Sequence, residues 1–414
     1  MSRPLRSRRQ ALGLIGSGAL AASAFATGSL QRIPVALARA PTERRLVVVI
    51  LRGALDGLAA VPPYADPGYR EVRGVLTLGS PGGPDGVLDL DGRFGLHPAL
   101  EPIHGLFKER ELLVFHAVAT PYRSRSHFDG QDLLENGTTA PRGARDGWLN
   151  RAIGLLGPSD TRLGLAVGQT VPLLLRGSTL VGSWAPKVMP ELDGDFLARL
   201  AALYRSDPLL GPAIEEGLRT QAMSDEVLGE DKRMGGGAGR GGRAISAVAG
   251  PVGKLLAAPK GARIAVMEVG GWDTHSNQGT TAGRLAPALR GLADGLMALK
   301  QGLGAAWSET AVAVVSEFGR TAAPNGSGGT DHGTAGIAFL LGGAVAGGRV
   351  VTRWPGLGSG NLFEGRDLAP TLDLRAIFKG VLSGHLGLPG EAIERVVFPD
   401  SREVATLRET MRRA

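Results

Sequence analysis

The sequence predicts an α/β fold with a largely parallel central sheet. Apolar runs of strand length recur along the chain, as is typical of central strands that are covered on both faces. Segments with helical patterns separate most of these runs. The main runs each lead into a cluster of polar residues, and ligands of open α/β sheets bind outside the carboxyl ends of strands. Sequential βα units would therefore bring these clusters to one edge of one sheet.

The first 40 residues predict an export signal. Arg8 and Arg9 lie in a segment similar to a twin-arginine signal, and a weakly apolar stretch over Ala11–Ala26 follows. Small residues offer cleavage sites after Ala38 or Ala40. The apolar stretch is too short and too rich in Gly, Ala and Ser for a stable membrane span. We expect the twin-arginine export machinery as a partner and a periplasmic or secreted protein.

Composition excludes several classes of function. Cleavage after Ala38 would remove five arginines and lower the net charge from +7 to +2, which takes away the main support for nucleic-acid binding. The chain has no cysteine, so disulfides, a thiol nucleophile and a lipoprotein anchor are excluded. We expect an exported protein of this kind to be stabilised by its core and by bound metal.

The first predicted strand is Arg45–Leu51, with the sequence RLVVVIL. It leads into a Gly-containing segment that ends at Asp56, where a ligand-bearing carboxylate would stand. An Asp-Gly pair after a strand is also a common turn, so both interpretations of Asp56 stay open. Residues 61–95 have a loop-like composition, and His97–Lys108 predicts a helix.

The second predicted strand is Glu111–Val118, followed by a dense polar cluster from Tyr122 to Asp132. Ser126 and His127 open a predicted helix in this cluster. At a helix N-terminus, Ser126 is a credible nucleophile or contact for a phosphate oxygen. The alternative is that Ser126 only caps the helix and that Asp129 is a first-turn acid.

The middle of the chain predicts a peripheral region. Helices are expected over Arg145–Leu156 and, with breaks, over Glu191–Leu218. Residues 225–243 are rich in glycine and predict a mobile loop. Because this glycine run does not follow a strand, a dinucleotide fingerprint, and with it a nucleotide-dependent oxidoreductase, is disfavoured. Three short strands are expected to form an edge hairpin or a small cap: Leu163–Val167, Leu173–Leu175 and Thr179–Val181.

The third main strand, Arg263–Val269, is followed by Asp273 and His275. Residues two apart in extended backbone point to one face, so this carboxylate and this imidazole can converge. That pair of donors suits a divalent metal. The segment Thr281–Leu303 then predicts a long helix whose leucine stripe faces the core.

The fourth main strand, Ala311–Val315, leads to Glu317 and Arg320. A loop rich in Gly, Asn and Ser follows and ends in Asp331-His332. These adjacent side chains would face opposite ways in a strand, so they can reach one metal only from a turn. Further expected elements are strands at Ile337–Leu341 and Val350–Thr352, a helix at Asp367–Leu382 and a peripheral helix at Ser401–Arg412.

A single domain is therefore expected over residues 41–400, with a C-terminal helix or tail over 401–414. The remaining histidines lack an acidic neighbour at ligand spacing and are interpreted as structural, with His385 kept as an outside candidate for a ligand. They are His97, His104, His116 and His385.

Gathered at one sheet edge, the carboxylates and imidazoles would repel each other without cations. One or two divalent ions (Zn, Mn, Mg or Ca) would resolve this and allow hydrolysis of phosphate or sulfate esters, with arginine holding the anionic oxygens. The expected substrate is an anionic small-molecule ester or polymer. The predicted metal ligands are Asp56, Asp273, His275, Glu317, Asp331 and His332, and the predicted catalytic residues are Ser126, His127 and Arg320.

The segments GGWDTH, SEFGRT, TDHG and RSHFDGQD, with the twin-arginine leader, resemble the bacterial domain-of-unknown-function 1501 (DUF1501) family. That family is grouped with the alkaline phosphatase and sulfatase superfamily. The resemblance spans about residues 44–388 and implies an alkaline-phosphatase-like three-layer α/β sandwich with a divalent-metal site. By position, Asp56 resembles the first-strand metal ligand and Ser126 the nucleophile. Asp273 with His275 resembles the ligands of one metal, and Asp331 with His332 those of the other.

The chain also departs from that superfamily. Glu317 stands at the strand end where sulfatases carry an Asp ligand, so it competes for that role. The sulfatase formylglycine has no Cys precursor here, and the region of Ser126 lacks the Ser-x-Pro-x-Arg pattern. The nucleophile therefore stays open, and His127 could instead be the base or a metal ligand. Two hypotheses remain. One is an exported metallohydrolase, and the other is a non-catalytic periplasmic binding or assembly protein that keeps the fold and a metal.

Overall fold

The computed structural model describes residues 43–157, 163–186, 202–208, 210–228, 242–259 and 261–412. The predicted export signal and its cleavage sites lie outside the described residues. So do residues 191–201 of the helix predicted over Glu191–Leu218, and residues 229–241 of the glycine-rich loop. Residues 225–228 and 242–243 of that loop belong to helices. Within the described residues, no helix is both long enough and apolar enough to cross a membrane.

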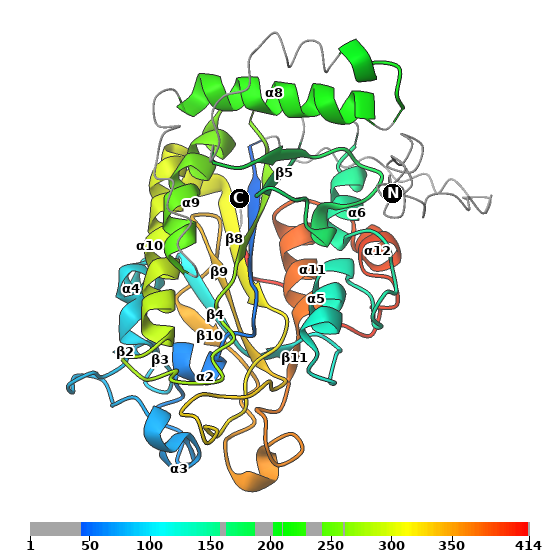
Figure 1. Cartoon of the computed structure of the whole chain (residues 1–414). Coiled ribbons are helices and arrows are strands. Elements are labelled where there is room, and N and C mark those ends of the chain that lie inside the picture. The colour runs from blue at the N-terminus through cyan, green and yellow to red at the C-terminus, as the bar shows by residue number, and fades with distance from the viewer. Residues whose placement is uncertain are drawn as a thin grey trace, which may run out of the picture. The chain divides into compact units, whose positions relative to one another are not determined.

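A nine-stranded sheet forms the centre of the described chain, in the order β10-β4-β9-β8-β1-β7-β5-β6, with β11 paired to β4 (Figure 1). All the strand pairs in it are parallel except those that β9 makes with β4 and β8. A small antiparallel pair, β2 (Leu88–Asp89) and β3 (Gly95–Leu96), lies apart. The strands of the main sheet are β1 (Arg45–Leu51), β4 (Leu112–Ala119), β5 (Gly164–Val167), β6 (Gly182–Trp184), β7 (Ile264–Val269), β8 (Thr310–Ser316), β9 (Gly336–Leu341), β10 (Arg349–Val351) and β11 (Leu372–Asp373).

β1 is a central strand and every one of its residues is buried. It pairs in parallel with β7 on one side and β8 on the other, so that Leu51 lies opposite both Val269 and Ser316. Successive side chains of a strand point to opposite faces. Accordingly Val47 belongs to one apolar core cluster and Val48 to another. The prediction of a strand covered on both faces is confirmed.

Helices cover both faces of the sheet, which gives three layers (Figure 1). One face packs against α4 (Glu101–Lys108), α9 (Gly242–Ala257) and α10 (Leu285–Leu303), and the other against α5 (His127–Asn136), α6 (Trp148–Leu155) and α11 (Leu374–Gly384). The predicted three-layer α/β sandwich with a largely parallel sheet is therefore confirmed. The remaining helices are α2 (Gly57–Ala60), α3 (Tyr69–Arg73), α8 (Leu210–Leu228), α12 (Gly390–Ala392), the π-helix η9 (Ile393–Val397) and the 3-10 helices η3 (Gly74–Leu76), η4 (Pro98–Leu100), η5 (Leu173–Leu175), η7 (Gly304–Glu309) and η8 (Ser359–Asn361).

The direction of β9 decides where the loop before it lies. Since β1, β4, β7 and β8 run the same way, their carboxyl ends share one edge of the sheet. No helix separates β8 from β9, and the chain returns beside β8 in the antiparallel direction. Both ends of the loop 317–335 consequently lie at that same edge. This places Asp331 and His332 beside the residues that follow β1, β4 and β7.

The edge beyond β7 differs from the prediction. The expected strand Leu173–Leu175 is the 3-10 helix η5, and the expected strand Thr179–Val181 lies just before β6. β5 and β6 pair in parallel and do not form a hairpin. The reason is the connection: residues 168–181 include a 3-10 turn and cross back over the sheet, as a parallel pair requires.

The prediction of a C-terminal helix over Ser401–Arg412 is wrong. Residues 401–412 form turns and irregular backbone. The buried ammonium of Lys379 donates hydrogen bonds to the carbonyl oxygens of Ser401 (2.6 Å) and Val404 (2.8 Å). These tertiary contacts use the acceptors that the first turns of a helix would need. Helical composition alone cannot reveal such competition.

Candidate metal centre

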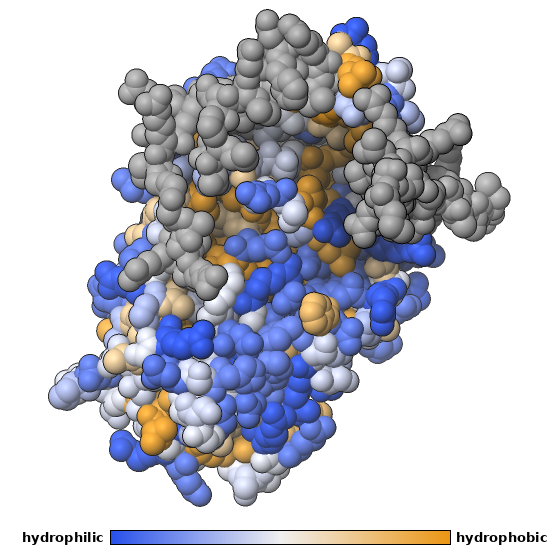
Figure 2. Space-filling view, viewed as in Figure 1, coloured by the Kyte–Doolittle hydropathy of each residue, from blue (hydrophilic) through white to orange (hydrophobic). Residues whose placement is uncertain are grey.

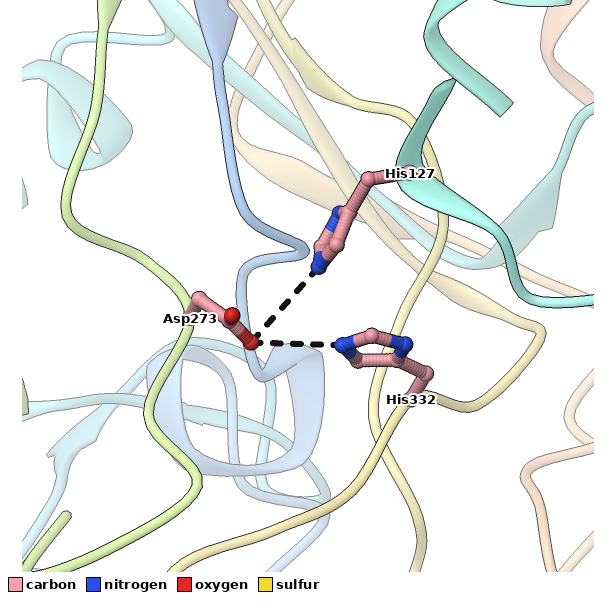
Figure 3. A group of neighbouring side chains, drawn as sticks. All are labelled: His127, Asp273 and His332. Carbon is pink, nitrogen blue, oxygen red and sulfur yellow. Dashed lines mark hydrogen bonds and ion pairs between the residues drawn. The ribbon is translucent and has the colours of Figure 1, made fainter. Parts of the chain in front are cut away.

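Three imidazoles and one carboxylate converge at the carboxyl edge of the sheet. His127 is the first residue of α5, Asp273 and His275 follow β7, and His332 lies near the end of the loop before β9. Figure 3 shows His127 and His332 pointing toward Asp273. Oδ1 of Asp273 lies 3.0 Å from Nε2 of His275, 3.3 Å from Nε2 of His332 and 3.6 Å from Nε2 of His127. The Nε2 atoms of His275 and His332 are 2.9 Å apart.

These separations fit ligands of a single cation. For nitrogen and oxygen ligands at about 2.1 Å from a tetrahedral metal, the ligand atoms lie about 3.4 Å from each other. The four separations given above range from 2.9 to 3.6 Å. Nε2 of His127 is buried and has no hydrogen-bond partner among the described residues. His127, Asp273 and His332 form a group of donors compact enough to hold a metal ion. The donor set therefore fits a divalent metal, and His275 extends it.

The other ring nitrogen of each histidine contacts an acceptor. The three pairs are His127 Nδ1 with Glu317 Oε1 (2.7 Å), His275 Nδ1 with Asp331 Oδ1 (2.9 Å) and His332 Nδ1 with the carbonyl oxygen of Arg125 (3.0 Å). Each acceptor takes a hydrogen from Nδ1, which leaves the lone pair of each ring on Nε2. This is the arrangement that proteins use to orient histidine ligands of metals.

Glu317 lies behind His127 and is fully buried. Its Oε1 also accepts hydrogen bonds from the backbone N–H of Gly53 (2.8 Å) and from Gln131 (3.2 Å), and its Oε2 accepts one from the Ser316 hydroxyl (2.9 Å). Burial raises the pKa of the Glu317 carboxyl, but the hydrogen bonds that it accepts, led by the one from His127, together outweigh burial and lower that pKa. The same hydrogen bond raises the pKa of His127. Glu317 thus lies behind the candidate ligand His127 and is not one of the converging groups.

Asp331 has a corresponding position behind His275. Its Oδ1 accepts from Nδ1 of His275 and from the side-chain amide of Asn325 (3.0 Å). The hydrogen bond from Asn325, and then that from His275, lower the pKa of the Asp331 carboxyl. Although Asp331 precedes His332 in the chain, the two side chains do different things. His332 enters the cluster, and Asp331 orients another histidine.

Arg320 has a different role from the expected anion contact. Its guanidinium is buried and donates to the carbonyl oxygens of Ala54 (2.9 Å), Gly53 (2.7 Å) and Thr330 (2.7 Å), and to Oδ1 of Asp273. It thereby joins the segments that follow β1, β7 and β8. Burial raises the pKa of Asp273, but the hydrogen bond and charge of Arg320 outweigh it and lower that pKa. Arg320 keeps Asp273 ionised and in place.

Asp56 is not brought into the cluster. Its Oδ2 accepts hydrogen bonds from Arg73 (2.6 Å) and Gln278 (2.7 Å), and its Oδ1 accepts one from the backbone N–H of Ala59 (3.2 Å). Asp56 is buried and caps helix α2. The resemblance implied a first-strand ligand at this position. In the structure the carboxylate is occupied by an ion pair and a helix cap.

Ser126 occupies the N-cap position of α5, beside the ligand-like His127. Its side chain makes no capping hydrogen bond, although its backbone N–H donates to the Tyr122 hydroxyl (3.1 Å). The preceding residue, Arg125, has a positive φ of 62° and is held by Asp367 through a 2.8 Å hydrogen bond. That backbone conformation turns the Arg125 carbonyl toward His332. Within the described residues, the Ser126 hydroxyl has no hydrogen-bond partner.

The other four histidines are structural, as the sequence predicted. Each ring contacts a backbone carbonyl oxygen through Nε2. The pairs are His97 with Thr280, His104 with Asp89, His116 with Val61 and His385 with Arg45.

Sequence reasoning missed the groups that support the cluster. Gln131 lies one helical turn after His127, so the helical spacing was a usable signal for it. Asn325 belongs to the loop rich in Gly, Asn and Ser, where a turn-forming role hides its bond to Asp331. The Arg125 carbonyl is a backbone group, which no side-chain pattern can indicate. These contacts arise only when separate segments meet.

The cluster faces solvent on one side. The side chains of Asp273 and His275 are 46% and 43% exposed. Figure 2 shows a mainly hydrophilic surface over the lower part of the view, where Figure 1 places the loops that follow the carboxyl ends of the strands. A polar molecule can therefore approach the candidate ligands from outside.

The fold and this cluster define an α/β protein with a candidate metal centre at the carboxyl edge of its sheet. A family model described as "Protein of unknown function (DUF1501)" matches residues 113–397, which is more than half of the chain. The chain belongs to that family. The matched region contains all the histidines and the aspartate of the cluster but not β1 or Asp56.

The chain is also similar to solved structures. The C-terminal periplasmic domain of EptC from Escherichia coli is 12% identical with a TM-score of 0.39, covering 88% of this chain and 89% of that one. The phosphonate monoester hydrolase of Agrobacterium radiobacter is 13% identical with a TM-score of 0.33, covering 84% and 74%. A 2-O GAG sulfatase is 12% identical with a TM-score of 0.34, covering 88% and 76%. The search of curated proteins returned no match.

Proposed function

We propose that this protein is a divalent-metal-dependent hydrolase of phosphate or sulfate esters. The observation that carries the proposal is the convergence of three imidazole Nε2 atoms on Oδ1 of Asp273. Structural metal sites are closed by their protein ligands, whereas catalytic sites stay open to substrate. Here two of the candidate ligand side chains are nearly half exposed, so a metal bound there could take an oxygen of the substrate as a further ligand, which supports a catalytic site.

The residues that would hold the metal are Asp273, His127, His275 and His332. A divalent ion bound there would stabilise developing negative charge on an ester and lower the pKa of an attacking hydroxyl. Around it, Glu317 and Asp331 keep the proton of their histidine partners on Nδ1. The backbone carbonyl of Arg125 does the same for His332.

Two further groups are placed to act on an anionic ester. Ser126 offers a hydroxyl at the start of α5, where unpaired backbone N–H groups favour negative charge, so it is the candidate nucleophile or oxygen contact. Since Arg320 is occupied, Arg366 becomes the candidate anion contact. It donates to the carbonyl oxygen of His332 (2.8 Å), and its side chain is 41% exposed. The planar guanidinium of arginine can donate two parallel hydrogen bonds to the oxygens of a phosphate or sulfate group.

The test combines metal analysis with turnover. Protein purified without chelator is analysed for bound divalent metal and assayed on panels of aryl phosphates and aryl sulfates. Asp273→Ala should lose both metal and activity. His104→Ala, which removes a histidine that contacts the carbonyl oxygen of Asp89 away from the cluster, should keep both.

The outcomes separate two functions. If wild-type protein contains no divalent metal, the proposal is wrong. If metal is bound but no ester is turned over across wide panels, a non-catalytic metal-binding protein of the periplasm is favoured instead.

The proposal includes export through the twin-arginine pathway to the periplasm or the medium. It is supported by the Arg8-Arg9 segment and by the absence of cysteine. The first 40 residues fused to a reporter should direct its export, and changing both arginines to lysine should abolish it. Export that persists after this change would contradict the proposed route.

A further inference from the structure

We infer that Gln278 is a positioning residue that clamps the two ligand-bearing loops of the metal centre together, with Asp56 as its anchor. The inference rests on the metal-binding part of the proposed function. The two loops are the segment after β7, which carries Asp273 and His275, and the end of the loop before β9, which carries His332.

One oxygen of Gln278 joins both loops. Its Oε1 accepts a hydrogen bond from the Thr274 hydroxyl (2.8 Å) and another from the Thr330 hydroxyl (2.7 Å). Thr274 lies between two of the candidate ligands, Asp273 and His275. Thr330 stands two residues before a third, His332. A single amide group is thus bonded next to ligands on both sides of the centre.

The other end of the same amide is anchored. Nε2 of Gln278 donates to Oδ2 of Asp56 (2.7 Å), and the same oxygen accepts from Arg73 (2.6 Å). Arg73 also donates to the carbonyl oxygen of Ala322 (3.0 Å). The orientation of the amide follows from its partners, because only its N–H group can face a carboxylate. Asp56 therefore fixes the Gln278 amide from the end opposite to the two threonines.

The whole network is buried. Thr274, Gln278, Thr330 and Arg73 have no exposed surface, and Asp56 is 1% exposed. A buried polar group that loses its partner carries an uncompensated desolvation penalty. The network therefore stays closed in the native state, since opening one bond leaves several groups unsatisfied. Such a network fixes its members in one arrangement.

Backbone contacts hold the same two segments together. The N–H of Thr330 donates to the carbonyl oxygen of Thr274 (3.1 Å), and the N–H of Gln278 donates to that of Gly328 (3.0 Å). At Gly329 a Cβ atom would collide with that same Thr274 oxygen, so only glycine allows this approach. The Gln278 side chain completes a contact that the backbones begin.

Separating the loops would affect the ligands directly. Nε2 of His275 and Nε2 of His332 come from different loops and lie 2.9 Å apart. Positioning a group at this precision requires support from behind. Without the clamp, part of the binding free energy of a metal would be used to bring the loops together, so affinity would fall.

The experiment compares Gln278→Leu with Asn150→Leu. Asn150 is an equally buried amide, which donates to the carbonyl oxygens of Leu175 (2.8 Å) and Thr179 (2.7 Å) and belongs to α6. Zn²⁺ affinity is measured by competition with a chromophoric chelator, and amide hydrogen exchange is measured on metal-free protein. Gln278→Leu should weaken Zn²⁺ binding by about 10–100-fold and speed exchange in both loops. Asn150→Leu should lower thermal stability while leaving Zn²⁺ affinity and loop exchange at wild-type values.

A double variant in which the amide and the carboxylate exchange positions tests the hydrogen bonds themselves. Gln278→Glu alone sets two carboxylates against each other at Asp56 and should weaken Zn²⁺ binding. Adding Asp56→Asn removes this repulsion, leaves one negative charge in the network with Arg73, and lets an amide N–H face the new carboxylate, which can still accept from both threonines. The double variant should recover most of the lost Zn²⁺ affinity.

Two results would overturn the clamp: Gln278→Leu with wild-type Zn²⁺ affinity and loop exchange, or a double variant no better than Gln278→Glu. Absence of ester turnover by the wild-type protein would sink the hydrolase but leave these measurements valid. Absence of Zn²⁺ binding by the wild-type protein would overturn both the metal centre and the role of the clamp in it.

Discussion

Replacing Glu317 by glutamine tests whether His127 is a ligand that is oriented from behind. Glutamine keeps the size of the side chain, and its carbonyl oxygen can still accept from the Gly53 N–H. It removes the negative charge that faces Nδ1 of His127 at 2.7 Å. A carboxylate partner makes an imidazole more basic and a better ligand. We therefore expect Glu317→Gln to weaken metal binding.

The size of the effect follows from the contacts. Loss of such an outer partner costs about 10–100-fold in metal affinity, or about 1.4–2.8 kcal/mol. Gln131 and Gly53 also donate to the same oxygen of Glu317, and glutamine retains an oxygen there. The orienting hydrogen bond is thus preserved and only its charge is lost. We expect a value near the lower end, about tenfold at neutral pH.

The pH dependence adds a second signature. The hydrogen bond that His127 donates to Glu317 raises the pKa of His127, so in wild-type protein protons compete with metal as the pH falls toward that raised value. In Glu317→Gln the pKa of His127 returns toward its ordinary range, and this competition begins at lower pH. The affinities of wild-type and variant protein should therefore converge as the solution becomes acidic.

Chelator competition at several pH values measures these affinities. The matched control is Glu135→Gln in α5, the helix that begins at His127. Glu135 is also buried, but it bonds Arg52 (2.7 Å) and the backbone N–H of Leu174 (2.9 Å) and none of the cluster histidines. It should leave metal affinity unchanged. If Glu317→Gln binds metal as tightly as wild-type protein at neutral pH while Asp273→Ala does not, the outer-shell role of Glu317 is refuted.

Three further changes probe the fold around the site. Burial lowers the pKa of His116 to about 4, so between its ordinary pKa and that value the unfolded chain binds a proton that the native state does not. The resulting stability, about 3 kcal/mol, is present above the ordinary pKa and is lost as the pH falls toward 4; His116→Gln should make the fall shallower in denaturant titrations across pH. Arg73→Met leaves the buried carboxylate of Asp56 without its 2.6 Å ion pair and should lower the free energy of unfolding by about 3–5 kcal/mol in urea titrations. An unchanged free energy of unfolding would contradict this role of the ion pair. In Gly319→Ala the added Cβ would collide with the carbonyl oxygen of Ala335, so thermal unfolding should show a loss of about 1–3 kcal/mol, and an unchanged Tm would show that the backbone yields there.

The strands and the edge they share could be predicted from the sequence. Burial on both faces leaves a continuous apolar run, and Arg45–Leu51 has the same bounds in the sequence pattern and in the structure. Parallel strands deliver the residues after them to one edge. That rule placed Asp273, His275 and His127 near each other without any knowledge of contacts. Each of these inferences depends on local pattern and on connection rules alone.

The roles of the individual carboxylates could not be predicted in this way. Asp56 and Glu317 each follow a buried strand, and by spacing alone each is as good a ligand as Asp273. Their partners distinguish them. Arg73 pairs with Asp56, and His127 donates to Glu317, so neither faces the centre. The same holds for Arg320, whose charge suggested an anion contact until backbone carbonyls surrounded it.

The sequence by itself therefore determined which elements form and which edge of the sheet carries the polar residues. The tertiary structure decided which of those residues converge as candidate ligands, which stand behind them and which lie elsewhere. It also decided that β9 runs antiparallel, which brings His332 to the centre. The physical reason is that a side chain's role depends on the groups it meets, and those groups come from segments as far apart in the chain as His127 and Glu317.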